Sequence, residues 1–280
     1  MSTHAPRIII VPKGGLANRM RAIASGLVYA NRLSRPMAVV WREDCELNAP
    51  FDLLFKVDHL PFAVARASSL KYHLYYEAPR KRNAYVSKVF TFLKGSKIIN
   101  IDDFESVSRL PEILSRHKRD VIINSGLQFA DFDHEFFSSI FTFSDVVTST
   151  KQQILRGSHP EYAVQIRRTD NAESTKNSPV ELFEGIIDKG ISDNPSVVFF
   201  LATDDQGTKQ YLSEKYPSNI IVNPNEASRN TRKGMVDAAA ELCIMAECST
   251  IYGSFWSSFS AVAALYGDKK IIVVKKEHHN

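Results

Sequence analysis

The sequence has few cysteines and little net charge, and each shortage excludes a class of protein. Its three cysteines, Cys45, Cys243 and Cys248, are too few and too widely spaced for a disulfide framework or a CxxC metal site. We expect reduced, buried thiols, which fit a reducing cytoplasm. The formal charge of +4 over 280 residues is too small to predict nucleic-acid binding, although residues 1–150 carry +5 and residues 151–280 carry −1.

The sequence also lacks long apolar runs. No stretch approaches the roughly 20 apolar residues of a membrane-spanning helix, and the polar start of the chain leads into no signal-peptide core. We therefore expect neither secretion nor membrane insertion, and a cytoplasmic location. Repeats, heptads and low-complexity tracts are absent as well, while the hydrophobic content of 44% allows one large domain or two compact ones.

Short β-branched runs alternate with helical patterns, which predicts an α/β fold. In the first half, a strand at 8–11 leads through Gly14 and Gly15 into a helix over 16–35, with Arg19 expected off its apolar face. Further strands are expected at 38–41, 97–101 and 121–124.

The second half is a more regular series, and we place the boundary between two domains, 1–145 and 146–280, after a polar and aromatic crossing segment at 128–150. Strands are expected at 162–167, 196–202, 219–223, 249–252 and 270–274, and helices at 179–189, 206–215, 234–247 and 257–266. This order predicts a doubly wound, Rossmann-like domain.

Residues 71–97 interleave aromatic rings with lysines and arginines. Such a stretch can contact sugar rings, a membrane surface or a nucleic acid, but it is also common on the helices of ordinary domains. We favour a structural role, or a role on the side of an acceptor, over lipid contact. Peripheral binding to an inner membrane stays open as the alternative.

The strongest functional signal is the pair Arg167 and Arg168, which directly follows the apolar run 163–166. Paired arginines are common on protein surfaces and contribute little there. At the end of a buried strand, however, their planar guanidinium groups can grip phosphate oxygens. The position of this pair therefore favours a phosphate site.

Two further predicted strands of the second half also end in polar residues. Asp204 and Asp205 follow one of them, and the hydroxyl-rich segment 254–260 leads from another into a helix. In open α/β sheets, ligands bind outside the carboxyl ends of the strands. Hydroxyls and backbone amides at the start of a helix bind anions. We expect these strand ends to face one crevice.

Four segments occur in the order typical of one superfamily: GGLANRMRAIASGL at 14–27, IRRTDN at 166–171, LATDD at 201–205 and GMVDAAAELCIMAECSTIYGSFWSSFSAVAAL at 234–265. Together they resemble the fucosyltransferase superfamily, which includes core α-1,6-fucosyltransferases, nodulation-factor fucosyltransferases and protein O-fucosyltransferases. Residues 42–150 match none of its motifs. The resemblance implies a GT-B-like architecture: two facing Rossmann-like domains, with the donor in the cleft and mainly on the C-terminal domain. It also implies an inverting glycosyltransferase that uses GDP-fucose as co-substrate, with no cofactor and no metal.

The resemblance also implies roles for single residues. Arg167 would stabilise the departing GDP, with Arg168 in support, while Asp237 would accept hydrogen bonds from the guanine edge. Asp204 and Asp205 would lie near the nucleotide or near the arginine pair. The other implied donor-binding residues are Gly14, Gly15 and Asn18 of the N-terminal loop, and Ser257, Ser258 and Phe259 around the pyrophosphate.

Gln165 departs from the family pattern, which commonly has histidine at this position. A glutamine can donate a hydrogen bond, but it cannot act as a base at neutral pH. The base, if the reaction needs one, stays open among Asp170, Asp44 and Glu43. Asp170 could equally hold Arg168 or cap the next turn.

The sequence leaves alternatives for the sugar donor and does not identify the acceptor. A GT-B enzyme could instead use GDP-mannose, a UDP-sugar or an ADP-sugar, and a non-catalytic glycan-binding protein could retain a relict donor pocket. The expected acceptor is an oligosaccharide or a glycolipid that the N-terminal domain recognises, and not a nucleic acid. The compact chain, which lacks a coiled stem or membrane anchor, suits a bacterial cytoplasmic enzyme of glycan biosynthesis.

Overall fold

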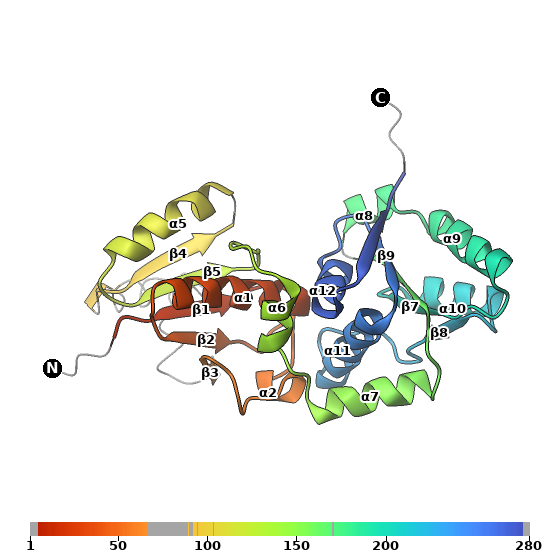
Figure 1. Ribbon diagram of the computed structural model, residues 1–280, viewed down its shortest axis with the longest axis horizontal. Coiled ribbons are helices and arrows are strands. Elements are labelled where there is room, and N and C mark those ends of the chain that lie inside the picture. The colour runs from red at the N-terminus through yellow and green to blue at the C-terminus, as the bar shows by residue number, and fades with distance from the viewer. Residues whose placement is uncertain are drawn as a thin grey trace. The chain divides into compact units, whose positions relative to one another are not determined.

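The computed structural model describes residues 5–66, 89, 92–93, 95–102, 104–169 and 171–276. The chain divides into two compact units, Met1–Phe141 and Thr142–Asn280. Each unit is built on a five-stranded sheet of its own (Figure 1). Residue 145, at which we placed the boundary from the sequence, is the first residue of helix α7 (Asp145–Leu155).

The sheet of the first unit is parallel throughout, with strand order β3-β2-β1-β5-β4. Its strands are β1 (Ile8–Pro12), β2 (Met37–Trp41), β3 (Ala63–Arg66), β4 (Lys97–Ile101) and β5 (Val121–Ser125). The described helices are α1 (Leu16–Arg32), α2 (Phe51–Leu54), α5 (Phe104–Arg116) and α6 (His134–Ile140). The three central strands, β2, β1 and β5, are buried along their whole length, which explains their continuous apolar runs.

The second unit also has an all-parallel five-stranded sheet, with strand order β10-β9-β6-β7-β8. Its strands are β6 (Tyr162–Ile166), β7 (Phe199–Thr203), β8 (Ile220–Val222), β9 (Thr250–Ser254) and β10 (Lys270–Val274). Its helices, besides α7, are α8 (Ala172–Asn177), α9 (Val180–Asp193), α10 (Gln206–Lys215), α11 (Arg232–Glu247) and α12 (Ser258–Gly267). The α/β fold class predicted from the sequence is confirmed in both units.

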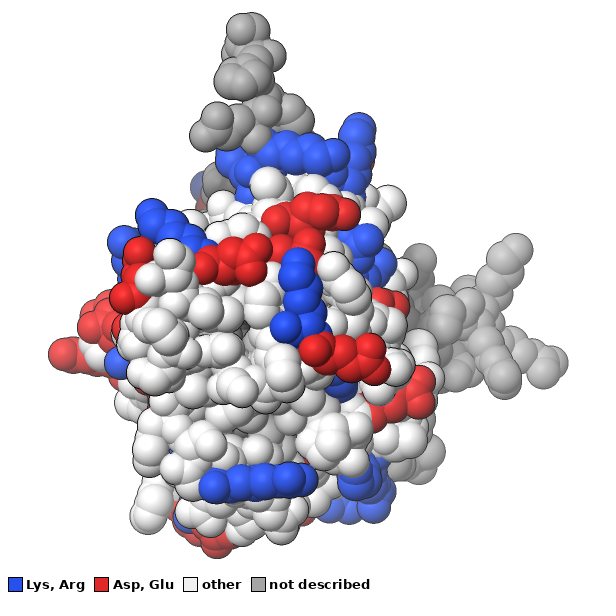
Figure 2. Space-filling model, turned by 90° about the vertical axis from the view of Figure 1, so that its right-hand side faces the viewer, with Lys and Arg blue, Asp and Glu red and all other residues white. Residues whose placement is uncertain are grey.

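Helices cover the second sheet on both faces. Phe183 and Ile187 of α9 pack with β6 and β7 residues in one apolar cluster. Helix α11 packs against α7 and α12, and α12 packs against β9 and β10. On the face of the molecule drawn in Figure 2, acidic and basic side chains lie interspersed.

Several elements escaped the sequence reading because they lack a clear apolar period. The crossing segment 128–150 contains α6 and the start of α7. In α7 only Val147 and Ile154 are buried. Helix α8 has only six residues, and its first turn depends on a side-chain cap by Asn171. Such short helices are specified by their caps and contacts more than by periodicity.

The cysteines correct one expectation. Cys248 is buried and Cys243 is half-buried, and burial raises the pKa of each thiol to about 12. Cys45, however, is exposed, so the expectation of buried thiols was wrong for this residue. In the part of the chain that the structure describes, every helix is too short or too polar to cross a bilayer.

Candidate functional site

The carboxyl ends of β6, β7 and β9 lie side by side in the second unit, because β6 pairs with both neighbours. The register sets Gln165 opposite Gly253 and Ile166 opposite Thr203. Arg167, Asp204 and Phe255 follow the three strands and therefore leave the sheet at the same edge. This is the edge at which the sequence placed a phosphate site.

Arg167 is attached to the end of β9 through its backbone and through its side chain. Its backbone N–H donates to Ser254 Oγ at 3.0 Å, and that hydroxyl donates in turn to the carbonyl oxygen of Gln165 at 3.1 Å. Its guanidinium Nη1 also donates to the carbonyl oxygen of Trp256 at 3.4 Å. These contacts hold the guanidinium beside the turn that leads into α12.

Asp204 fixes the turn that carries the arginine pair. Its Oδ1 accepts from the backbone N–H of Arg168 at 2.7 Å, and its Oδ2 accepts from Thr169 Oγ1 at 2.8 Å. The Arg168 carbonyl oxygen is held by Thr175 Oγ1 at 3.1 Å. Nη1 of Arg168 is buried and has no hydrogen-bond partner among the described residues. Asp204 therefore lies beside the arginine pair and stabilises its backbone.

The first turn of α12 offers unused hydrogen-bond donors next to Arg167. Ser257 is the N-cap residue, but its side chain makes no capping hydrogen bond, and the first turn contains no acidic residue. The Ser257 hydroxyl is buried without a partner in the described part of the chain. Ser258 and Phe259, the first two helical residues, are half-buried. Free amides and the positive end of a helix dipole form a site for an anion.

Asp205 has a different task from its neighbour, because it caps helix α10. Its Oδ2 accepts from the backbone N–H and from the Oγ1 of Thr208, both at 2.7 Å. These hydrogen bonds, with a smaller contribution from the charge of Arg168, lower the pKa of the Asp205 carboxyl. Its carboxylate thus stabilises the start of α10.

Asp237 belongs to a buried polar network near the end of β8. Only 4% of this α11 residue is exposed, and its Oδ2 accepts from Asn225 Nδ2 at 3.1 Å and from Lys233 Nζ at 3.5 Å. The buried Lys209 of α10 donates to the carbonyl oxygen of Asn225 at 2.6 Å. One helical turn beyond Asp237, burial raises the pKa of Glu241 to about 7.

The glycine loop of the first unit is held from two sides. Gly14 has a φ of 80°, a left-handed conformation that favours glycine, and its N–H donates to Glu46 Oε2 at 3.0 Å. Its carbonyl oxygen accepts from Arg19 Nε at 2.7 Å. Gly15 is the N-cap residue of α1, and Asn18 Oδ1 accepts from Arg21 Nη2 at 2.7 Å.

Arg19 is the principal residue that the sequence reading misplaced. The side chain is fully buried, contrary to the expectation that it lies off the apolar face of α1. Its Nη2 contacts Asp44 Oδ1 at 2.8 Å, and its guanidinium carbon lies 5.0 Å from the centre of the Trp41 ring. Its spacing of three from Leu16 and four from Ile23 was the signal that placed it on the buried face.

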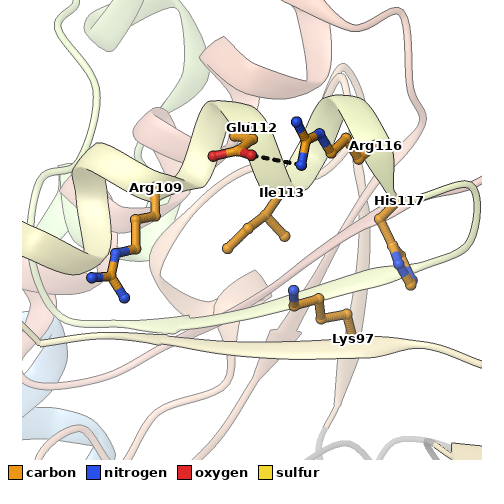
Figure 3. A pocket seen from close by; sticks show the side chains of 6 residues that line it. All are labelled: Lys97, Arg109, Glu112, Ile113, Arg116 and His117. Atoms are coloured by element: carbon orange, nitrogen blue, oxygen red, sulfur yellow. Dashed lines mark ion pairs between the residues drawn. The ribbon is translucent and has the colours of Figure 1, made fainter.

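A separate hollow of about 390 Å³ lies in the first unit between α5 and β4 (Figure 3). It is lined by Lys97, Arg109, Glu112, Ile113, Arg116 and His117. Its two arginines are already paired along α5: Arg116 contacts Glu112 at 2.8 Å and Arg109 contacts Glu105 at 2.5 Å. Exposed pairs of this kind belong to an ordinary solvated helix face.

The fold has relatives among solved structures although the sequence matches no protein-family model and no curated protein. NodZ α-1,6-fucosyltransferase co-crystallised with GDP is 18% identical, with a TM-score of 0.66 over 94% of this chain and 93% of that chain. A mutant of Arabidopsis thaliana FUT1 in complex with GDP is 13% identical, with a TM-score of 0.65 over 100% of this chain and 72% of that chain. POFUT1 in complex with GDP-fucose is 13% identical, with a TM-score of 0.58 over 98% of this chain and 99% of that chain. The chain therefore has the fold of these three proteins.

Within this fold, four of the assignments made from the sequence need further comment. Asp170 and most of the segment 71–97 lie outside the described residues. Asp44, one candidate base, has a structural role, because its Oδ1 also accepts from the backbone N–H groups of Glu46 at 3.0 Å and Leu47 at 3.2 Å. Gln165 is buried, and its Oε1 has no partner among the described residues.

The structure thus brings Arg167, Arg168, Asp204, Ser257 and Ser258 to one edge of the second sheet. Asp237 lies in a separate network beyond β8 of the same sheet. Across the described residues, no group of three or more histidine, cysteine, aspartate or glutamate side chains is arranged to hold a metal ion. Lys209 and Asn225 are supporting residues that the sequence reading did not select, and Ser254 was named there only as part of the segment 254–260.

Proposed function

We propose that this protein is an inverting, metal-independent glycosyltransferase that moves fucose from GDP-fucose to a hydroxyl of an oligosaccharide or glycolipid. The observation that carries the proposal is the position of the Arg167 guanidinium beside the uncapped N-terminus of α12. Solved structures of this fold include proteins bound to GDP and to GDP-fucose, which supports the same donor here. The acceptor is assigned to the first unit.

The chemistry that this site would perform is the stabilisation of a leaving diphosphate. The bond between the anomeric carbon of fucose and the β-phosphate oxygen breaks, and negative charge develops on that oxygen. Arg167, the Ser257 hydroxyl and the backbone amides at the start of α12 offer positive charge and hydrogen bonds to it. The fixed guanidinium takes the part that a divalent cation plays in metal-dependent transferases.

The acceptor hydroxyl would attack the anomeric carbon from the face opposite the diphosphate, which inverts the configuration. Its proton passes to a carboxylate or to water as the new C–O bond forms. Asp44 is the less suitable candidate, because Arg19 and two backbone amides already hold its Oδ1. Asp170 and Glu43 remain the candidates for this role.

Asp237 would provide the preference for guanine. Its two carboxylate oxygens can accept from the N1–H and from the 2-amino group of a guanine edge, a pair of donors that uracil lacks. The hydrogen bond from Asn225 Nδ2 goes to Oδ2 and orients the carboxylate. Lys209 stabilises this arrangement by holding the Asn225 carbonyl oxygen.

The decisive experiment compares nucleotide binding with transfer. Thermal unfolding in GDP, UDP and ADP should show stabilisation by GDP, and a ligand at 100 times its Kd contributes about 2.7 kcal/mol. Transfer of radiolabelled fucose from GDP-fucose should continue in excess EDTA, and NMR should show the inverted anomer. Preference for UDP would contradict the role of Asp237. Loss of transfer in EDTA would contradict metal independence, and the absence of any nucleotide shift would leave a glycan-binding protein as the better account.

A further inference from the structure

Trp256 combines exposure with an unusual backbone conformation next to Arg167. The chain has two tryptophans. Trp41 is buried, whereas Trp256 is 67% exposed. Its φ is 56°, in the left-handed region where a bulky side chain is disfavoured and glycine fits readily. A residue that keeps an exposed indole at such a position suggests that the indole itself is used.

The surrounding contacts fix the position of this indole. Its ring stacks on the Phe255 ring with centroids 5.3 Å apart and an angle of 15° between the planes. The Phe255 N–H donates to Ser178 Oγ at 2.8 Å, and the Ser257 N–H donates to the carbonyl oxygen of Ser254 at 3.2 Å. Both neighbours of Trp256 are therefore anchored to the sheet edge, and the indole packs against one of them.

The Trp256 carbonyl oxygen ties this aromatic pair to the phosphate-binding arginine, since it accepts from Arg167 Nη1 at 3.4 Å. A sugar that is bonded to a phosphate held by Arg167 would lie directly beside that phosphate, and therefore near Trp256. Ligand sites commonly use rigid aromatic faces to cover the apolar parts of a ligand. The C–H face of a pyranose ring is an apolar surface of matching size.

We propose that Trp256 is a carbohydrate-stacking residue, whose indole packs on the C–H face of a pyranose at the reacting end of the site. This inference rests on the proposed function and deepens it, because it assigns the recognition of the sugar rather than of the nucleotide. The pyranose can belong to the donor or to the acceptor. Separate arms of the test distinguish these two sources.

The first test uses the fluorescence of the unmodified protein. Trp41 is 2% exposed, so a neutral quencher such as acrylamide reaches Trp256 in preference. GDP alone should leave the quenching constant nearly unchanged, whereas GDP-fucose should lower it at least twofold if the donor sugar covers the indole. If the acceptor sugar covers it, methyl glucoside, methyl galactoside or methyl N-acetylglucosaminide should lower it in the presence of GDP. Equal protection by GDP alone, or no protection by any sugar, would overturn the proposal.

The second test separates recognition from folding. Trp256→Gly removes the indole and relaxes the left-handed backbone, so its thermal midpoint should equal or exceed that of the wild type. Its GDP-induced shift should be retained, while kcat/KM for transfer falls at least tenfold and Trp256→Phe recovers part of the loss. Arg156→Gly is the matched control, because Arg156 is also exposed and has a φ of 50° at the end of α7. This variant should transfer fucose at the wild-type rate.

The two proposals can fail separately. A wild-type protein that neither binds GDP nor transfers fucose would contradict the proposed function. Normal GDP binding and transfer, together with an unchanged kcat/KM in Trp256→Gly, would contradict only the sugar-stacking role.

Discussion

Asp204 accepts a hydrogen bond of 2.7 Å from the backbone N–H of Arg168, so the end of β7 holds the turn that carries the arginine pair. The same carboxylate accepts from the hydroxyl of Thr169 at 2.8 Å. An acidic residue beside two arginines invites the interpretation of a side-chain ion pair. Here its first task is to fix the backbone from which both guanidinium groups project.

Asp204→Ala should weaken the fold and the site together. The variant loses the charged carboxylate that accepts hydrogen bonds from a backbone N–H and a hydroxyl, which costs about 1–3 kcal/mol. Urea unfolding would measure this loss of stability. GDP affinity should fall because the arginine turn loosens. Asp204→Asn keeps one carbonyl acceptor and should be intermediate, whereas the exposed Asp58→Ala is a surface control that should stay near wild type. A fully active Asp204→Ala would show that the turn does not need this support.

Arg167→Ala should abolish most of the transfer while the protein stays folded. Removal of one preorganised donor to developing charge typically costs about 10²–10³ in rate. Arg167→Lys should also be poor, because a point charge cannot reproduce the planar fork. Initial rates with GDP-fucose and circular dichroism would measure both effects. Arg109→Ala in the hollow beside α5 is the control, and a comparable loss there would contradict our reading of that hollow as a solvated face.

Lys209→Met should reduce GDP affinity without touching the nucleotide. The change preserves most of the buried stem but removes the ammonium that holds the Asn225 carbonyl oxygen at 2.6 Å, which frees Asn225 and Asp237. We expect a loss of about tenfold in GDP affinity, equivalent to about 1.4 kcal/mol, by isothermal titration. Lys215→Met on the same helix removes the ion pair with Glu184 and the contacts with the Tyr211 and Tyr216 rings, and this variant should bind GDP normally. Equal GDP affinities for the two variants would argue against the Asp237 network as the site that binds the guanine.

Glu241 should make the stability of the protein depend on pH. Burial raises its pKa from 4.5 to about 7, opposed by the Lys209 charge and by Asn223, while Asp237 raises it further. The folded state therefore holds a proton more tightly than the unfolded state, so this contribution is full below pH 4.5 and is lost as the pH rises through 7. At about 1.4 kcal/mol per pKa unit the loss is at most about 3.5 kcal/mol.

Glu241→Gln tests this pH dependence, because glutamine keeps the shape of the protonated carboxyl. Urea unfolding at pH 5 and pH 8 should give a smaller difference for the variant than for the wild type, with the variant more stable at pH 8. Identical pH profiles would mean that Glu241 does not titrate in this range.

Gly253→Ala should disturb the start of α12. A Cβ on this β9 residue would lie 2.3 Å from the Oγ and 2.7 Å from the Cβ of the buried Ser260, so the helix must shift. We expect a loss of about 1–3 kcal/mol in unfolding free energy together with weaker GDP binding. Gly185→Ala is the opposite case, because nothing lies within 4 Å of its added Cβ in α9. That change should stabilise the protein by about 0.5–1 kcal/mol, and a similar loss for both variants would contradict the packing argument.

The sequence by itself determined the elements whose pattern is local. The runs that became β1, β5 and β6 could be recognised because each is short and mainly apolar, as expected for a parallel strand covered on both faces. The apolar run of β10 was recognised in the same way, although this strand lies at the edge of its sheet and is largely exposed. The polar residues that follow β6 and β7 were visible for the same reason: the strand ends where the apolar run ends. Short helices such as α8 left no comparable signal, because their start depends on one cap.

Only the tertiary structure decided what each polar residue does. Arg167 and Ser254 are 87 residues apart in the sequence, and Arg168 and Asp204 are 36 apart, yet each pair is joined by a hydrogen bond. Sequence spacing could not distinguish Asp204, which holds the arginine turn, from Asp205, which caps α10. Nor could it reveal that the Arg19 guanidinium lies over the Trp41 ring, or that Trp256 has a left-handed backbone conformation. Apolar periodicity belongs to a single segment, whereas a hydrogen bond depends on strand order and register, which bring distant segments together.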